Sequence, residues 1–158
     1  MKTKLLIGSL LALGLLTTAN AATETANFNV TAQVVKACTI TSAPADINFG
    51  NYDPTAPNNI VSSTTFGMRC TKGVGYSITI DTASGTPRTM TDGTDSLTYV
   101  LKNGSAIWGE LQSGNEVSGT AASTAETSFT IDAEVTANQD VSDNSAVYTQ
   151  TNTITITY

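Results

Sequence analysis

The side chains that could do acid–base or nucleophilic chemistry are few, and their arrangement argues against catalysis. The chain has no histidine among its 158 residues, which removes the commonest general base and excludes a Ser-His-Asp triad. Its 13 Asp and Glu residues lie mostly in loops beside Gly, Thr or Asn, as Asp92, Asp95 and Asp143 do. Carboxylates in such places usually form turns and show no pairing across a cleft. We therefore expect no enzyme and no small-molecule substrate.

The residues that could bind a metal also give no sign of a functional site. Cys38 and Cys70 are the only cysteines, no CxxC spacing is present, and without histidine a zinc site is improbable. The segment "DGTD" at 92–95 lacks the spacing and the terminal Glu of a calcium loop. We expect neither a metal nor another cofactor. Trp108 is better explained as a core residue than as a platform for sugar binding.

The first 21 residues have the pattern of a secretory signal peptide. Lys2 and Lys4 precede the apolar run "LLIGSLLALGLL", and Ala19 and Ala21 supply the small residues of a cleavage site. The apolar run is too short for a bilayer span of about 20 residues. Export to an oxidising compartment makes a single Cys38–Cys70 disulfide the expected state. Without Lys2 and Lys4 the chain keeps 5 basic against 13 acidic residues, a net charge of −8, which disfavours nucleic acid as a partner.

Residues 22–158 read as one all-β domain with no helix. Apolar residues alternate with polar ones in short runs separated by Gly, Pro, Asn and Asp, which predicts strands and turns. Asn103-Gly104 is a strong hairpin signal. We expect an antiparallel Ig-like β-sandwich in which the disulfide ties an early strand to the third strand. About seven or eight strands are expected: one within 26–40, and others at 47–50, 60–70, 76–80, 97–101, 106–108, 128–135 and 147–158. The segments 83–95 and 114–123 are expected to be loops.

The segment "ANFNVTAQVVKACTI" at 26–40 is too long for an ordinary strand and is interrupted at Lys36. Before Lys36, the side chains of Phe28, Val30, Ala32 and Val34 share one face. One hypothesis makes 26–40 a single bent strand of its own domain. The other makes the part before Lys36 a strand that adds itself to the sheet of a neighbouring molecule, as in pilin donor-strand complementation.

The ordered fragments "FNVTAQVVKACTI", "INFGNYDP", "STTFGMRCTKG", "YSITID", "RTM", "LTYVL", "WG" and "YTQTNTITITY" resemble the spore coat protein U family. That family includes pilin subunits of archaic chaperone–usher pili. The resemblance covers residues 26–158. It implies an incomplete Ig-like sandwich that lacks its last strand and is completed by a donor strand from another subunit, and it also implies the Cys38–Cys70 disulfide.

The resemblance further implies the partners and the roles of the two ends of the chain. A periplasmic chaperone would fill the gap first, and an outer-membrane usher would then exchange it for the donor of an identical or homologous subunit. The expected organisation is a signal peptide at 1–21, a donor segment at 22–35 and a pilin domain at 36–158. Phe28, Val30, Ala32 and Val34 would be the donor residues, and Ile154, Ile156 and Tyr158 would lie on the final strand beside the groove.

The function implied is a structural shaft subunit of a surface pilus, exported through the periplasm and serving adhesion and biofilm formation. One domain with one donor segment is typical of a shaft subunit. Two alternatives remain: a secreted structural protein of a spore-coat type with the same fold, and a self-contained carbohydrate-binding β-sandwich. The last alternative needs exposed aromatic residues, so burial of Trp108 and Tyr99 would count against it.

Overall fold

A computed structural model describes residues 21–82, 88–109, 116–142 and 146–158, and the predicted signal peptide up to residue 20 lies outside them. The described residues form strands and turns without a helix, and no membrane-spanning helix is found among them. The strands are β1 Cys38–Ser42, β2 Ile60–Cys70, β3 Gly75–Thr82, β4 Arg88–Thr91, β5 Ser96–Asn103, β6 Ala106–Ile107, β7 Val117–Thr120, β8 Thr127–Val135 and β9 Asn152–Thr157.

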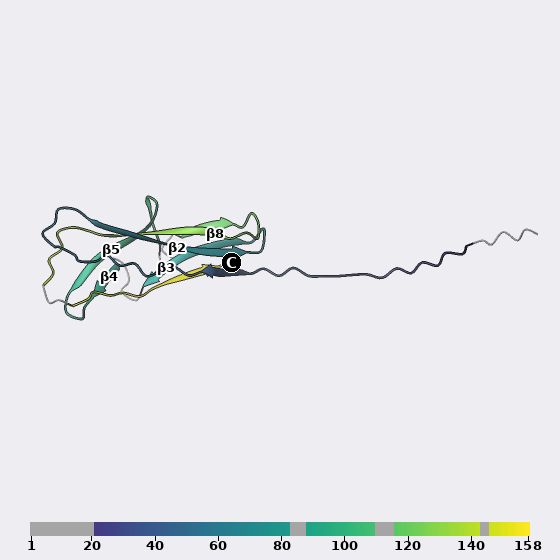
Figure 1. Cartoon of the computed structure of the whole chain (residues 1–158), viewed down its shortest axis with the longest axis horizontal. Helices are drawn as coiled ribbons and strands as arrows, with labels where there is room; N and C mark the ends of the chain where they lie inside the picture. The colour runs from purple at the N-terminus through teal and green to yellow at the C-terminus, as the bar shows by residue number, and fades with distance from the viewer. Residues whose placement is uncertain (1–20, 83–87, 110–115, 143–145) are drawn as a thin grey trace, which may run out of the picture. The chain divides into compact units, whose positions relative to one another are not determined.

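The strands form two antiparallel sheets, which confirms the predicted all-β antiparallel class. One sheet has the order β1-β2-β8-β5-β4, with the short β6 beside β5, and the other has the order β7-β3-β9. Figure 1 shows β2 and β8 running side by side, and the two strands pair from Ile60 with Val135 to Met68 with Thr127. The register is fixed because a slip of one residue would turn the apolar face of each strand toward water.

The core lies between the two sheets and is centred on aromatic side chains. Phe66 of β2 stacks on Phe129 of β8 with ring centroids 5.3 Å apart, and Trp108 packs 6.2 Å from Phe66. Trp108 is 1% exposed, and its indole N–H donates to the carbonyl of Thr130. Trp108 and Tyr99 are therefore core residues, which counts against a carbohydrate-binding surface built on them.

The alternating runs predicted several strands correctly. In β8 the side chains of Ile131, Ala133 and Val135 are buried while those between them are not. The Asn103-Gly104 turn joins β5 to β6, and Gly104 has the positive φ of +61° that this turn needs. The segment "DGTD" is a tight turn between β4 and β5, in which the carboxylate of Asp92 accepts hydrogen bonds from the N–H groups of Thr94 and Asp95.

Other boundaries were wrong, and in each case long-range pairing decided the outcome. β4 and β7 lie in segments expected to be loops, but β4 pairs with β5 and β7 pairs with β3. The strand expected over 147–158 begins only at Asn152. Residues 47–50 form no strand, so Cys70 lies in the second strand of the chain and the disulfide joins β1 to β2. A segment with weak strand propensity forms a strand where a neighbouring strand pairs with it, and a segment with strong propensity forms none where no neighbour pairs with it.

Candidate functional site

A large open groove separates the two sheets along part of the core. Its cavity volume is about 1220 Å³, whereas a closed protein core has few voids larger than a water molecule. The floor is apolar and comes from β3, β5 and β8, with the side chains of Ile80, Leu97, Leu101, Ile131, Ala133 and Val135. The floor side chains are each at most 4% exposed, so the groove opens above a floor that is itself well covered.

The two walls of the groove are backbone segments that pair little with other strands. One wall is the segment 44–54, which forms no strand although Ile47 and Phe49 alternate inward and pack against the core. The other wall is the segment 146–152 continuing to Ile154, and β9 pairs with β3 alone among the described strands. Within this second wall, Thr149 exchanges backbone hydrogen bonds with Thr91 of β4. Unpaired sheet edges expose donors and acceptors that readily pair with another strand. A chain laid between these walls could pair with both.

The wall at 44–54 is held in place at its far end by Tyr52. The Tyr52 hydroxyl donates to the carbonyl of Thr136 at 3.1 Å and accepts from the N–H of Gln139 at 2.8 Å. Gln139 in turn exchanges hydrogen bonds with the N–H and carbonyl of Thr98 at 2.6 and 2.8 Å. These bonds tie the wall to the ends of β5 and β8, so the groove keeps its width although nothing pairs with the wall.

A buried arginine and its neutral hydrogen-bond partners, here the Arg88 cluster, lie beside the groove floor. Arg88 of β4 is 5% exposed, and its guanidinium donates to Asn152 Oδ1 of β9 and to the carbonyls of Trp108 and Ile80. The Tyr99 hydroxyl donates to the same Asn152 oxygen at 2.9 Å. A buried charge is tolerated only when it is well hydrogen-bonded. Here the bonds join β4 and β5 of one sheet to β3 and β9 of the other.

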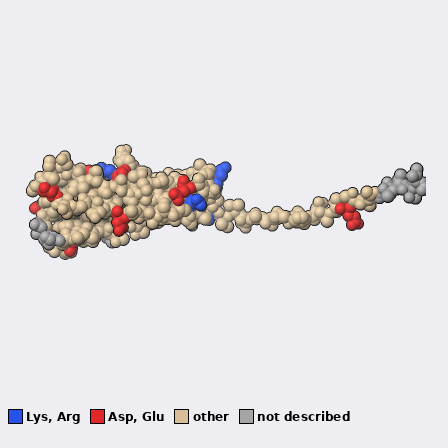
Figure 2. Space-filling view, viewed as in Figure 1, with Lys and Arg blue, Asp and Glu red and all other residues tan. Residues whose placement is uncertain are grey.

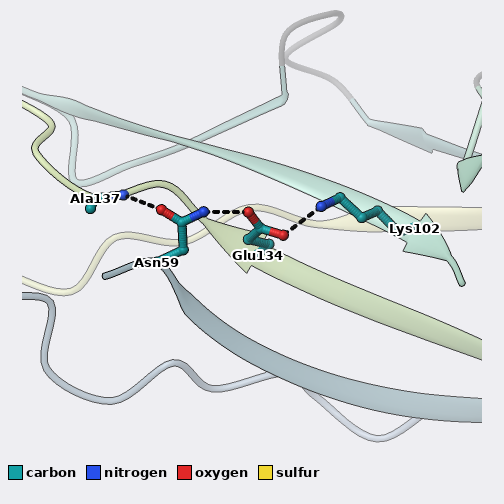
Figure 3. A network of polar contacts seen from close by, with 4 residues as sticks. All are labelled: Asn59, Lys102, Glu134 and Ala137. Atoms are coloured by element: carbon teal, nitrogen blue, oxygen red, sulfur yellow. Dashed lines mark hydrogen bonds and ion pairs between the residues drawn. The ribbon is translucent and has the colours of Figure 1, made fainter. Parts of the chain in front are cut away.

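A separate polar network lies on the outer face of the larger sheet (Figure 3). Glu134 of β8 accepts from the Lys102 ammonium of β5 and from the side-chain amide of Asn59, whose own oxygen accepts from the N–H of Ala137. The hydrogen bond from Lys102, followed by that from Asn59, lowers the pKa of Glu134 below its ordinary value. The network links neighbouring strands and lies outside the groove.

The structure places the predicted site residues in three groups. Cys38 and Cys70 form the disulfide, as expected. Phe28, Val30, Ala32 and Val34 belong to no strand and are exposed, Phe28 and Val30 by 85% and 86%. Ile154 lines the groove, Ile156 packs against the core, and the Tyr158 side chain is 57% exposed.

Sequence reasoning missed the wall at 44–54 and the Arg88 cluster. The alternation of Ile47 and Phe49 was visible, but it was read as an ordinary strand. Arg88 stood in an expected loop, and a single arginine carries no signal of burial. Among the described residues, no group of His, Cys, Asp or Glu is placed to hold a metal ion.

Comparison with known proteins identifies the family of this chain. The profile of the Spore Coat Protein U domain matches residues 24–157. The chain belongs to the spore coat protein U family. This confirms the resemblance seen in the sequence fragments. A search of curated proteins found no significant match.

A solved structure supports the fold of this spore coat protein U domain. It is the CsuC–CsuE chaperone–tip adhesion subunit pre-assembly complex from the archaic chaperone–usher Csu pili of Acinetobacter baumannii. The TM-score is 0.51 and the sequence identity is 19%, with 79% of this chain and 40% of that chain covered. This spore coat protein U domain thus spans less than half of the chain it resembles, and the likeness is one of fold.

Proposed function

We propose that this protein is a pilus shaft subunit that polymerises by donor-strand complementation. The observation that carries the proposal is a groove of about 1220 Å³ with an apolar floor, between the unpaired segment 44–54 and the free edge of β9, in a chain that also has an exposed, alternating apolar segment. Residues 26–34 of one subunit would lie between the wall at 44–54 and β9 of the next subunit.

The chemistry of the segment suits the groove. Phe28, Val30, Ala32 and Val34 lie on one face of an extended chain, because side chains alternate along a strand. The floor residues of the groove are aliphatic apart from Tyr99 and Thr64. Burial of the larger anchors contributes roughly 1.5–3 kcal/mol each. Ordering the segment costs a comparable total at about 1–2 kcal/mol per residue, so insertion is favourable mainly because it also fills the groove.

The partners follow from the same groove. A periplasmic chaperone would occupy it before assembly, and an outer-membrane usher would exchange the chaperone for the donor of an identical or homologous subunit. The Csu structure is a pre-assembly complex of a chaperone with a pilus subunit, which supports this route. The product would be a surface filament exported through the periplasm, serving adhesion and biofilm formation. A secreted coat protein of the same family is the second candidate, and it would assemble through the same groove.

Variants of the donor segment test the proposal. Phe28→Ser with Val30→Ser removes two apolar anchors, and we expect the purified chain to lose assembly while its unfolding transition stays unchanged. The matched control is Asn29→Ser with Thr31→Ser, which alters the opposite face of the segment and should assemble normally. Normal assembly of the Phe28/Val30 variant, measured by light scattering and electron microscopy, would refute the proposal.

A further inference from the structure

Basic residues gather at one end of the β-sandwich. Arg69 is the penultimate residue of β2, Lys72 lies in the turn to β3, and Lys36 precedes β1 at the same end. All three side chains are exposed and are called the basic collar here. The collar contains three of the five Lys and Arg residues that follow residue 20. Figure 2 shows basic side chains gathered at this end of the domain. Glu126, which precedes β8, lies at the same end because Thr127 pairs with Met68.

The chain is clamped to the collar where the donor segment would end. The Thr71 hydroxyl donates to the carbonyl of Val35 at 3.1 Å, and the Thr71 N–H donates to the carbonyl of Ala37 at 2.9 Å. The disulfide at Cys38 follows directly. Val35 is thus fixed to the domain, and the last donor residue, Val34, is its immediate neighbour. No free linker separates the donor from its own domain.

Acidic residues gather at the opposite end of the sandwich. Asp53 lies in the loop before β2, Asp92 and Asp95 lie in the turn between β4 and β5, and Asp140 follows β8. These loops meet because Val135, the last residue of β8, pairs with Ile60 at the start of β2 and with Tyr99 of β5. The four aspartates are called the acidic rim here. No Lys or Arg occurs in residues 51–59, 92–95 or 136–142.

Two carboxylates of the rim are held in fixed positions by hydrogen bonds from neutral donors. Asp53 accepts from the N–H and hydroxyl of Thr55, and Asp95 accepts from the N–H of Ser142. The hydroxyl and then the N–H of Thr55 lower the pKa of Asp53. Neutral donors of this kind stabilise the ionised form of a carboxylate. Asp53 is therefore held in its ionised form.

The acidic rim surrounds the mouth of the groove. Asp53 and Ser142, which bonds to Asp95, both line the groove. Tyr148 also lines it, and its neighbour Thr149 exchanges backbone hydrogen bonds with Thr91, which precedes Asp92. Burial, followed by the charges of Asp92 and Asp95, raises the pKa of Tyr148.

When the donor segment of one subunit enters the groove of the next with Val34 at this mouth, its Lys36 lies two residues further along the chain. The Cα atoms of Lys36 and Val34 are at most about 7 Å apart, because two extended residues span at most about 3.6 Å each. That distance is within the Debye length of about 8 Å at physiological ionic strength.

We propose that the basic collar of one subunit docks on the acidic rim of the next copy of this chain when the donor segment fills the groove. The proposal rests on the proposed function and names a second contact beside the groove. The charges also favour one direction of insertion: Val34 at the rim sets opposite charges against each other, whereas the reverse direction sets collar against collar. Opposite charges mainly speed correct encounter and select orientation.

The test compares assembly rates of the full chain without residues 1–21 by light scattering at low and high salt. Neutralising the rim with Asp53→Asn and Asp140→Asn keeps the turn-forming oxygens, and we expect assembly at about 20 mM salt to slow at least threefold with a weaker salt dependence. Glu116→Gln with Asp132→Asn makes the same change in net charge away from the rim and the groove, and should assemble like the unmodified chain. Equal rates and salt dependence for the two double variants would overturn the proposal.

A charge exchange separates this proposal from the groove itself. The collar variant Lys36→Glu/Arg69→Glu/Lys72→Glu and the rim variant Asp53→Lys/Asp140→Lys should each assemble slowly alone. The two lysines offset the charges of Asp92 and Asp95, so the rim of the rim variant is neutral. In the 1:1 mixture the basic collar of the rim variant can meet the acidic rim of the collar variant, so mixed dimers should form faster than dimers of either variant alone. A mixture no faster than its components overturns the docking contact and leaves donor-strand assembly standing. If the unmodified chain assembles at no salt concentration, the proposed function fails and the docking contact fails with it.

Discussion

Arg88 Nη1 lies 3.2 Å from Asn152 Oδ1 and joins the two sheets at the floor of the open groove. The same guanidinium donates to the carbonyls of Ile80 and Trp108. The groove lacks the packing that normally holds two sheets together, so these bonds supply an inter-sheet tie in its place. The groove is thus kept open by polar contacts at its floor and by the Tyr52 contacts at its wall.

Replacement of Arg88 tests this tie. Arg88→Met keeps much of the volume but leaves the carbonyls of Ile80 and Trp108 without their donor, and we expect unfolding free energy to fall by about 2–3 kcal/mol. Tyr99→Phe removes a single hydrogen bond to Asn152 and should cost about 1 kcal/mol. Urea unfolding measures both. An Arg88→Met variant as stable as Tyr99→Phe would show that the tie is weaker than its geometry indicates.

Glu134 gives a prediction about pH. Its pKa is lowered in the folded protein from an ordinary value of 4.5 by the hydrogen bonds from Lys102 and Asn59. The stabilisation is therefore present above about pH 4.5 and is lost as the pH falls through the lowered pKa. Glu134→Gln should cost no more than about 1 kcal/mol at pH 7, because the pair is partly exposed. The difference in unfolding free energy between the two proteins should shrink as the pH falls below 4.5 through the lowered pKa, and a difference that does not change with pH would contradict the assignment.

The disulfide is expected to stabilise the domain mainly through the unfolded state. Cys38 and Cys70 are 32 residues apart, and a loop of this size corresponds to about 3–4 kcal/mol in the chain-entropy model. Cys38→Ala with Cys70→Ala should lower the unfolding free energy by that order, measured against the oxidised chain. A reducing agent should reproduce the loss in the unmodified chain and change nothing in the double variant.

Ala133 tests the accepting side of the groove. It lies on the groove floor with 2% exposure, and a larger side chain there would extend into the space proposed for the donor. Ala133→Leu should slow assembly at least tenfold while leaving the donor segment intact. Mixed with an excess of the unmodified chain, the variant should still be incorporated as a donor and should shorten the filaments. Filaments of unchanged length with the variant present at every position would contradict this role.

The sequence predicted the fold where each strand carries its own signal. The alternation of Phe129, Ile131, Ala133 and Val135 and the Asn103-Gly104 turn both hold in the structure. β4 and β7 escaped prediction because they are four-residue strands defined by their partners. Ile47 and Phe49 show the reverse case, since the pattern of a strand is present and the partner is not.

The candidate site was partly visible for the same reason. Phe28, Val30, Ala32 and Val34 stood out because an apolar face is unusual outside a core. The groove could not be seen in the sequence, because the space between two sheets is a property of the assembled fold. Arg88 and Asn152 are 64 residues apart, and only the packing of one sheet on the other brings them together.

Hydrogen exchange of the donor segment tests the central claim most directly. The amide groups of residues 28–34 should exchange rapidly in the dilute, unassembled chain and should become strongly protected in assembled filaments, because they would then pair with the two groove walls of a neighbour. The amides of β8 should be protected in both states. Protection of residues 28–34 in the monomer at every concentration, or their rapid exchange in the filaments, would contradict the account.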